Sequence, residues 1–214
     1  METENKAFVK RPESEAGKEK SMKVLLINGS RRKSGCTYTA LCEAAGALQK
    51  EGIETEILFV GLDAVNGNID EAVKKAGPLV KEADGIIVGS PVYYASPSGE
   101  VLSFLDRLFW LCGDDMKHKP GAAVVSARRA GTTASLDVLN KYFMINEMPV
   151  VSSQYWNMVH GNSPEEVRKD EEGMQIMRTL GRNMAWLLKC IAAGKDKGIA
   201  PGPAEERART NFIR

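Results

Sequence analysis

Short apolar runs alternate with longer amphipathic stretches along most of the chain. The apolar runs predict β-strands at residues 23–28, 53–60, 85–90, 121–126 and 149–152. The amphipathic stretches predict helices near residues 36–51, 68–82, 98–112, 132–146 and 164–192. Strand–helix alternation of this kind is typical of an α/β domain in which helices cover both faces of a parallel sheet. The pattern therefore predicts a three-layer sandwich over residues 22–193.

The strands differ in how apolar they are, and this difference predicts their order in the sheet. Three runs are apolar throughout, as central parallel strands are: residues 24–27, 86–88 and 122–125. The second run carries Glu54 and Glu56, which predict one wet face and hence an edge strand. Pro149 opens the fifth run, and proline is tolerated at the start of an edge strand. These positions favour the flavodoxin-like order 2-1-3-4-5, with a binding crevice beyond the carboxyl ends of strands 1, 3 and 4.

The turn after the first strand, residues 28–37, combines hydroxyls, two glycines and three consecutive cations. A helical pattern follows at once, and a helix N-terminus attracts anions through its free N–H groups and its dipole. The glycine spacing excludes a P-loop, and the three spaced glycines of a dinucleotide fingerprint are missing. An ordinary surface turn is the alternative. The candidate phosphate ligands are Ser30, Arg31, Arg32, Ser34, Gly35, Cys36 and Thr37.

Two further loops are expected at the same edge of the sheet. The loop after the third strand places two aromatic residues in a proline-bounded turn and offers Pro91, Val92, Tyr93, Tyr94 and Ala95. The loop after the fourth strand offers Ser126, Arg128, Arg129 and Gly131. A phosphate tail, a flat ring and polar ring edges would satisfy the three loops together, and flavin mononucleotide (FMN) has those parts. The tyrosines could instead belong to the core, and the arginines could be solvated or could grip the phosphate.

Composition narrows the function classes. The chain has 214 residues and a net charge of +1, which predicts no general attraction to nucleic acid or to membranes. The four cysteines, at positions 36, 42, 112 and 190, contain no C-x-x-C pair. They favour a reducing, cytoplasmic setting and predict neither a metal site nor a disulfide framework. Residues 1–21 are predicted to be a mobile extension, and residues 194–214 a linker and tail.

The motifs Gly29-Ser30-x-Arg32-x-Ser34-Gly35-x-Thr37, Gly89-Ser90-Pro91-Val92-Tyr93-Tyr94 and Phe104-Leu105-Asp106-Arg107 carry a family resemblance. Together they resemble the NADPH-dependent FMN reductase family of the flavodoxin superfamily, over roughly residues 22–192. The resemblance implies bound FMN, NADPH or NADH as reductant, and a homodimer or homotetramer. It implies phosphate contacts from the first loop and ring contacts from residues 91–95. Some iron–sulfur flavoproteins of this group carry a compact cysteine motif after the second strand. Here no cysteine lies between Cys42 and Cys112, so no cluster is predicted.

These features predict an oxidoreductase that passes hydride from a nicotinamide nucleotide through FMN to an acceptor such as free flavin, a quinone or an azo compound. Hydride addition creates negative charge near flavin N1 and O2, where Arg128, Arg129 or the backbone around Gly131 could stabilise it. No catalytic acid or base is required, and none is assigned. The alternative is a flavodoxin-like electron carrier or a regulatory flavin-binding protein without turnover of its own. A phosphate-ester enzyme without flavin is a weaker third option.

Other conspicuous residues allow two interpretations. Cys36, at a helix N-terminus, could be an activated thiolate, but Cys42 stands where a tyrosine phosphatase would need arginine. Trp156 and His160 lie in the aromatic-rich segment 154–161 and could cover a flavin or simply be packed. The remaining cysteines and the methionines of the last helix are expected in the core, with Trp186 packed near them.

Overall fold

The computed structural model describes residues 21–212, so the predicted N-terminal extension lies almost entirely outside the described residues. Five parallel strands form the sheet in the order β2-β1-β3-β5-β6. They are β1 (Lys23–Asn28), β2 (Glu54–Phe59), β3 (Gly85–Tyr93), β5 (Gly121–Ala127) and β6 (Met158–His160). A short strand, β4 (Ser96–Pro97), pairs antiparallel with the end of β3. Counted over the parallel strands alone, this is the predicted order 2-1-3-4-5, with β2 at the edge.

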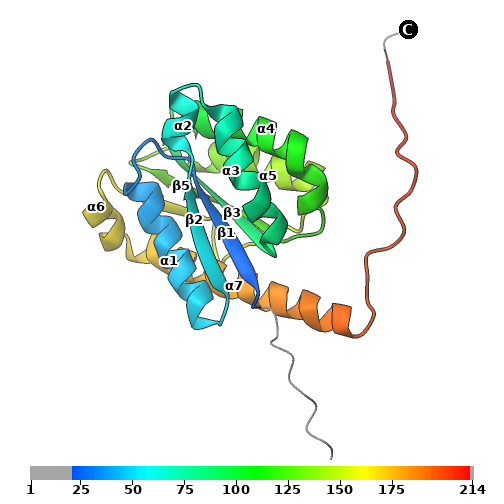
Figure 1. Cartoon of the computed structure of the whole chain (residues 1–214). Helices are drawn as coiled ribbons and strands as arrows, with labels where there is room; N and C mark the ends of the chain where they lie inside the picture. Colours follow the sequence, from blue (N-terminus) through cyan, green and yellow to red (C-terminus); the bar gives the residue numbers. More distant parts are fainter. Residues whose placement is uncertain (1–20, 213–214) are drawn as a thin grey trace, which may run out of the picture.

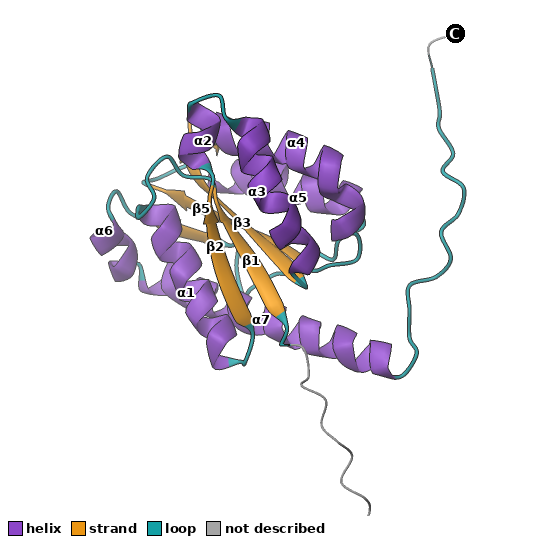
Figure 2. Ribbon diagram, viewed as in Figure 1, coloured by secondary structure: helices purple, strands orange, loops and turns teal. Residues whose placement is uncertain are grey.

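Helices cover both faces of the sheet (Figure 1, Figure 2). One face carries α1 (Cys36–Lys50), α6 (Pro164–Lys169) and α7 (Glu171–Asp196). The other face carries α2 (Gly61–Val65), α3 (Ile69–Glu82), α4 (Gly99–Met116) and α5 (Thr132–Ile145). Successive residues of β1 enter opposite cores, with Leu25 and Ile27 on the α3–α5 side and Val24 and Leu26 on the α1–α7 side. Both sides of the central strands are therefore buried, which explains their unbroken apolar runs.

The fifth strand lies later in the chain than predicted. Residues 149–152 contribute only an isolated bridge between Val150 and Gly121, at the amino end of β5. The chain then leaves the sheet and returns as β6, whose residues pair with the carboxyl end of β5. The predicted strand was wrong because Pro149 has no N–H to donate and so begins a connection that touches β5 at a single point.

The helices also differ from the prediction in three places. The expected helix at 164–192 is two helices, because Asp170 has a ψ of 81° and its carboxylate caps α7 by accepting from the Gly173 N–H at 2.9 Å. Helix α7 then runs on to Asp196, and α2 was not predicted.

Trp186 is 67% exposed and Cys190 is exposed as well, so the expected burial of both was wrong. No helix in residues 21–212 is long and apolar enough to cross a membrane.

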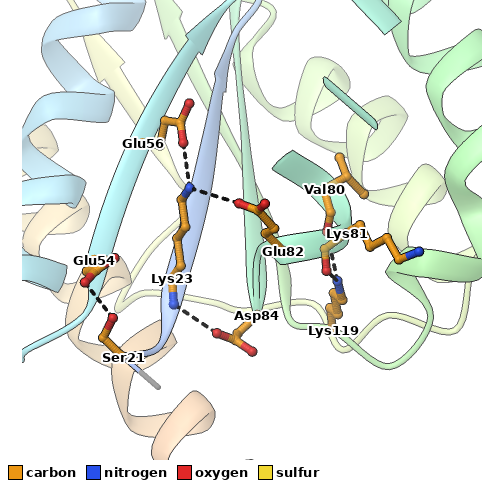
Figure 3. Close-up of polar contacts among 9 residues, drawn as sticks. All are labelled: Ser21, Lys23, Glu54, Glu56, Val80, Lys81, Glu82, Asp84 and Lys119. Atoms are coloured by element: carbon orange, nitrogen blue, oxygen red, sulfur yellow. Dashed lines mark hydrogen bonds and ion pairs between the residues drawn. The ribbon is translucent and has the colours of Figure 1, made fainter. Parts of the chain in front are cut away.

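The amino ends of the strands are closed by charged groups (Figure 3). Lys23 Nζ lies 2.6 Å from Glu56 Oε2, and this hydrogen bond raises the pKa of the lysine above its usual value. The backbone N–H of Lys23 donates to Asp84 Oδ2 at 2.9 Å, which ties β1 to the turn before β3. Glu54 accepts from the Ser21 hydroxyl at 2.5 Å. The two glutamates that predicted an edge strand thus lie among polar partners, and the opposite end of the sheet remains for the three loops.

Candidate functional site

The loops after β1 and β3 meet at the carboxyl ends of the strands. The N–H of Gly29 donates to the carbonyl of Gly89 at 2.9 Å, and the Ser98 hydroxyl donates to the carbonyl of Gly29 at 3.2 Å. A Cβ atom on Gly89 would lie 2.9 Å from Thr37 Cγ2 and 2.8 Å from a methyl of Leu41, so α1 packs directly on this crossing. The first two predicted loops are therefore neighbours, as the strand order requires.

The third loop joins them through two hydroxyls and a glycine. Thr37 Oγ1 and Ser126 Oγ are buried and lie 2.8 Å apart, which links the start of α1 to the end of β5. A Cβ atom on Gly131 would lie 2.5 Å from Ala95 Cα and 2.8 Å from Val92 Cγ1. The predicted convergence of the three loops at one rim is confirmed.

A buried asparagine shapes the first loop. Asn28 is fully buried at the end of β1; its Oδ1 accepts from the Ser30 N–H at 3.1 Å, and its Nδ2 donates to the Lys33 carbonyl at 3.0 Å. The Ser30 hydroxyl accepts in turn from the Arg32 N–H at 3.1 Å. On the other side, a Cβ on Gly61 would lie 2.0 Å from the Ser30 carbonyl oxygen, so α2 rests against the loop. The sequence pattern predicted neither the role of Asn28 nor the contact with α2. For Asn28 the signal was a polar residue at the end of an apolar strand.

The N-terminus of α1 has no side-chain cap. Gly35 occupies the N-cap position, and no side chain caps the helix there. The nearby hydroxyls do not cap it either, because the Thr37 hydroxyl is engaged with Ser126 and Ser34 is exposed. The first N–H groups of a helix lack intrahelical acceptors. Here they stand beside the exposed cations Arg32 and Lys33, which suits an anionic group.

Cys36 is the first residue of α1, and its side chain is partly buried. Its Sγ lies 3.6 Å from the carbonyl oxygen of Gly161, to which the thiol donates. Burial raises the pKa of the thiol, and this effect outweighs the lowering by Arg32. An activated thiolate would need the opposite shift, so the residue is better suited to hold the loop than to attack a substrate.

The second loop is a β-hairpin with a strained tip. Val92 pairs with Pro97 and Tyr93 with Ser96, which leaves a two-residue turn at Tyr94 and Ala95. Both turn residues have positive φ, 49° and 64°, an arrangement of type I′ hairpins that usually takes Asn or Gly. Tyr93 is 41% exposed and Tyr94 is fully exposed, which rules out the core interpretation for both. Strained backbone and an exposed aromatic side chain together are typical of a binding loop.

The third loop presents cations from a rigid base. Ser126 is buried, whereas Arg128 and Arg129 are exposed. Gly131 precedes α5 with a φ of 94°, and its carbonyl accepts from the Ser135 hydroxyl at 2.8 Å. The close approach of the hairpin to this glycine places the two arginines next to the tyrosines' loop.

The segment that leads into β6 and forms it, residues 154–161, reaches the same rim. His160 ends β6, and its ring Nε2 lies 3.1 Å from the carbonyl oxygen of Arg129. Tyr155 and Trp156 pack edge to face with ring centroids 4.5 Å apart, and both are about half exposed. Packing within this chain leaves about half of the Trp156 ring exposed, and contact of Trp156 with a flavin stays a prediction.

A model of the NADPH-dependent FMN reductase family matches residues 22–163. The chain belongs to this family. It is similar to an iron–sulfur flavoprotein of Methanocaldococcus jannaschii, 32% identical over 195 residues, which cover 79% of the chain and 99% of that protein. It is also similar to an NADPH azoreductase of a Bacillus species, 34% identical over 123 residues, which cover 56% of the chain and 65% of that enzyme.

The fold is shared with solved flavoproteins. A structure of RosB holding 8-demethyl-8-formylriboflavin-5′-phosphate superposes with a TM-score of 0.65, at 15% identity, over 91% of the chain and 94% of RosB. Family membership makes the chain an NAD(P)H-dependent oxidoreductase with FMN as its cofactor. The residues present fit that cofactor, because the open end of α1 suits its phosphate and the exposed hairpin beside it suits its ring.

Proposed function

We propose that the three converging loops hold FMN, and that this family member uses it to reduce a small planar acceptor. The uncapped N-terminus of α1, next to a strained and exposed two-tyrosine hairpin, is the observation that carries the proposal. Phosphate contacts are assigned to Ser30, Arg31, Arg32, Ser34, Gly35, Cys36 and Thr37. Ring contacts are assigned to Pro91, Val92, Tyr93, Tyr94 and Ala95. The ring edge is assigned to Ser126, Arg128, Arg129 and Gly131.

Bound FMN supplies the redox chemistry by accepting hydride from the nicotinamide nucleotide and passing electrons to the acceptor. The chain supplies binding, orientation and charge. The N–H groups of α1, with Arg32, neutralise the phosphate. The exposed guanidinium groups of Arg128 and Arg129 stabilise negative charge at the ring edge and attract anionic nucleotides. Hydride transfer through FMN needs no proton donor or acceptor from the protein.

Two observations indicate the class of acceptor: the name of the Bacillus relative and the exposed ring of Tyr94. The Bacillus relative is named an NADPH azoreductase, and azo compounds are flat and aromatic. In this chain, Tyr94 projects fully into solvent at the hairpin tip, where a flat acceptor could stack on its ring. Azo compounds and quinones are therefore the acceptor classes we propose.

The first experiment is the visible spectrum of the purified protein, followed by anaerobic addition of NADPH or NADH. We expect a flavin spectrum that bleaches, and steady nucleotide oxidation once an azo dye or a quinone is added. A protein that binds FMN but oxidises neither nucleotide with any of these acceptors would instead be an electron carrier or a regulatory flavin-binding protein. A protein that cannot be reconstituted with FMN would contradict the site itself.

We propose further that this chain works without the iron–sulfur cluster for which its M. jannaschii relative is named. A cluster needs several thiolates around one centre. Cys36 packs against the core under α1 and α7, whereas Cys112 packs against the core on the opposite face of the sheet. Cys190 is exposed on α7. Iron and acid-labile sulfide at stoichiometric levels in anaerobically purified protein would contradict this proposal.

The assembly into two or four copies and the cytoplasmic location stay predictions. Light scattering coupled to size-exclusion chromatography measures the assembly directly, and a monomer at micromolar concentration would contradict it.

A further inference from the structure

The side chain of His160 links two segments that are distant in the sequence, and the proposed function leaves it unused. Its ring Nε2 lies 3.1 Å from the carbonyl oxygen of Arg129, and its backbone N–H donates to Asp170 Oδ2 at 2.7 Å. Ring Nδ1 lies 3.9 Å from the same carboxylate oxygen. We propose that His160 is a positioning residue that holds the arginine turn, residues 128–131, at the rim of the site.

The anchor on one side of His160 is rigid. Asp170 uses Oδ1 to cap α7, accepting from the Gly173 N–H at 2.9 Å, and uses Oδ2 for the backbone of His160. A Cβ on Gly173 would lie 2.3 Å from Oδ2, so the absence of a side chain at 173 leaves room for the carboxylate. The carboxylate is thereby fixed to the start of a 26-residue helix that packs along α1. The hydrogen bond from the backbone N–H of His160 to this carboxylate therefore holds His160 in place.

The partner on the other side is exposed. Arg128, Arg129 and Ala130 follow β5 as three exposed residues before Gly131 begins the approach to α5. A carbonyl oxygen only accepts, so the bond requires the proton of the imidazole on Nε2. Residues 128–130 are exposed, so a hydrogen bond to the carbonyl of Arg129, the middle residue of the three, restrains their motion.

The consequence for ligands rests on the proposed function, in which the arginine turn borders the FMN ring and the nicotinamide nucleotide. A turn held by His160 presents both guanidinium groups from a restricted set of positions. A free turn would sample many more, and binding would lose the advantage of preorganisation. The effect is expected on binding constants more than on the turnover number.

The test of positioning uses limited trypsin digestion of the protein with FMN at a saturating concentration, because trypsin cleaves after Arg128 and Arg129. We expect cleavage there to be about fivefold faster in His160→Ala than in the unaltered protein, the factor typical of one lost hydrogen bond. His160→Gln, whose amide can donate to the same carbonyl, should restore most of the protection. The matched control is His118→Ala. His118 is the other histidine of the chain and lies in the turn between α4 and β5, at the opposite end of the sheet. Equal cleavage rates in His160→Ala and the unaltered protein, with circular dichroism spectra that match, would overturn the inference.

The test of function uses the FMN dissociation constant, from quenching of flavin fluorescence, and the KM and kcat for NADPH. His160→Ala should raise the KM or the FMN dissociation constant about fivefold and leave kcat nearly unchanged. The double variant Arg128→Ala/Arg129→Ala separates the two hypotheses. If it weakens binding while His160→Ala does not, the inference is overturned and the proposed function stands. If His160→Ala accelerates cleavage and neither variant alters binding, the positioning role is supported and the arginine turn is not part of the flavin site.

Discussion

The substitution Gly131→Ala tests the junction on which the site depends. Gly131 has a φ of 94°, where a residue with a Cβ pays roughly 1–2 kcal/mol. The added Cβ would also lie 2.5 Å from Ala95 Cα, a backbone atom that cannot move without shifting the hairpin. Overpacking of this kind typically costs about 1–3 kcal/mol. We therefore expect the free energy of unfolding to fall by about 2–4 kcal/mol, and FMN affinity to fall about tenfold or more as Tyr93 and Tyr94 are displaced.

Two other glycines separate the contributions. Gly52 has a φ of 80° with open space around it, so Gly52→Ala should show only the backbone cost of roughly 1–2 kcal/mol. Gly99 begins α4 in open space without positive φ, and Gly99→Ala should be neutral or slightly stabilising. The assay is urea unfolding of each apoprotein, together with fluorescence titration by FMN. If Gly131→Ala loses no more stability than Gly52→Ala, the close approach of the hairpin to the arginine turn is refuted.

Three further predictions concern the loops and the outer helices. Asn28→Ala should lower the free energy of unfolding by about 2–3 kcal/mol, because both hydrogen bonds of a buried side chain are lost, and should weaken FMN binding; unchanged urea midpoints would contradict it. Arg128→Ala and Arg129→Ala should each lower the two-electron potential of bound FMN by about 10–30 mV, which potentiometric titration measures. If both variants keep the potential of the unaltered protein, the arginines have no electrostatic role at the flavin. Burial and the hydrogen bond that the Tyr142 hydroxyl donates to Asp106 raise the pKa of this tyrosine well above its ordinary value. The neutral phenol is therefore favoured in the folded protein, so its contribution to stability is full below about pH 10 and is lost as the pH rises further. Urea unfolding at pH 8 and above pH 10 should show a smaller alkaline loss of stability in Tyr142→Phe than in the unaltered protein, and identical losses would contradict this assignment.

The sequence by itself determined the architecture and the rim on which the site lies. Runs such as residues 24–27 and 86–88 are apolar on both faces, a pattern that only central strands between two helix layers satisfy. The glutamates of residues 53–60 likewise marked the edge. Because the strands are parallel, their carboxyl ends share one edge of the sheet, and the strand order makes the three loops neighbours there.

Only the tertiary structure decided how that rim is supported. Asn28 inside the first loop, the contact between Gly131 and Ala95, and the link from Asp170 through His160 to Arg129 join groups whose partners lie on other elements or in irregular turns. Hydrophobic periodicity reports which face of an element is buried, but it carries no information on which distant atom a given carbonyl or Cβ will meet. For the same reason the fifth strand was predicted too early in the chain and the break between α6 and α7 was not predicted. Pairing with β5 sets the first and the carboxylate of Asp170 sets the second, and both interactions exist only once the chain has folded.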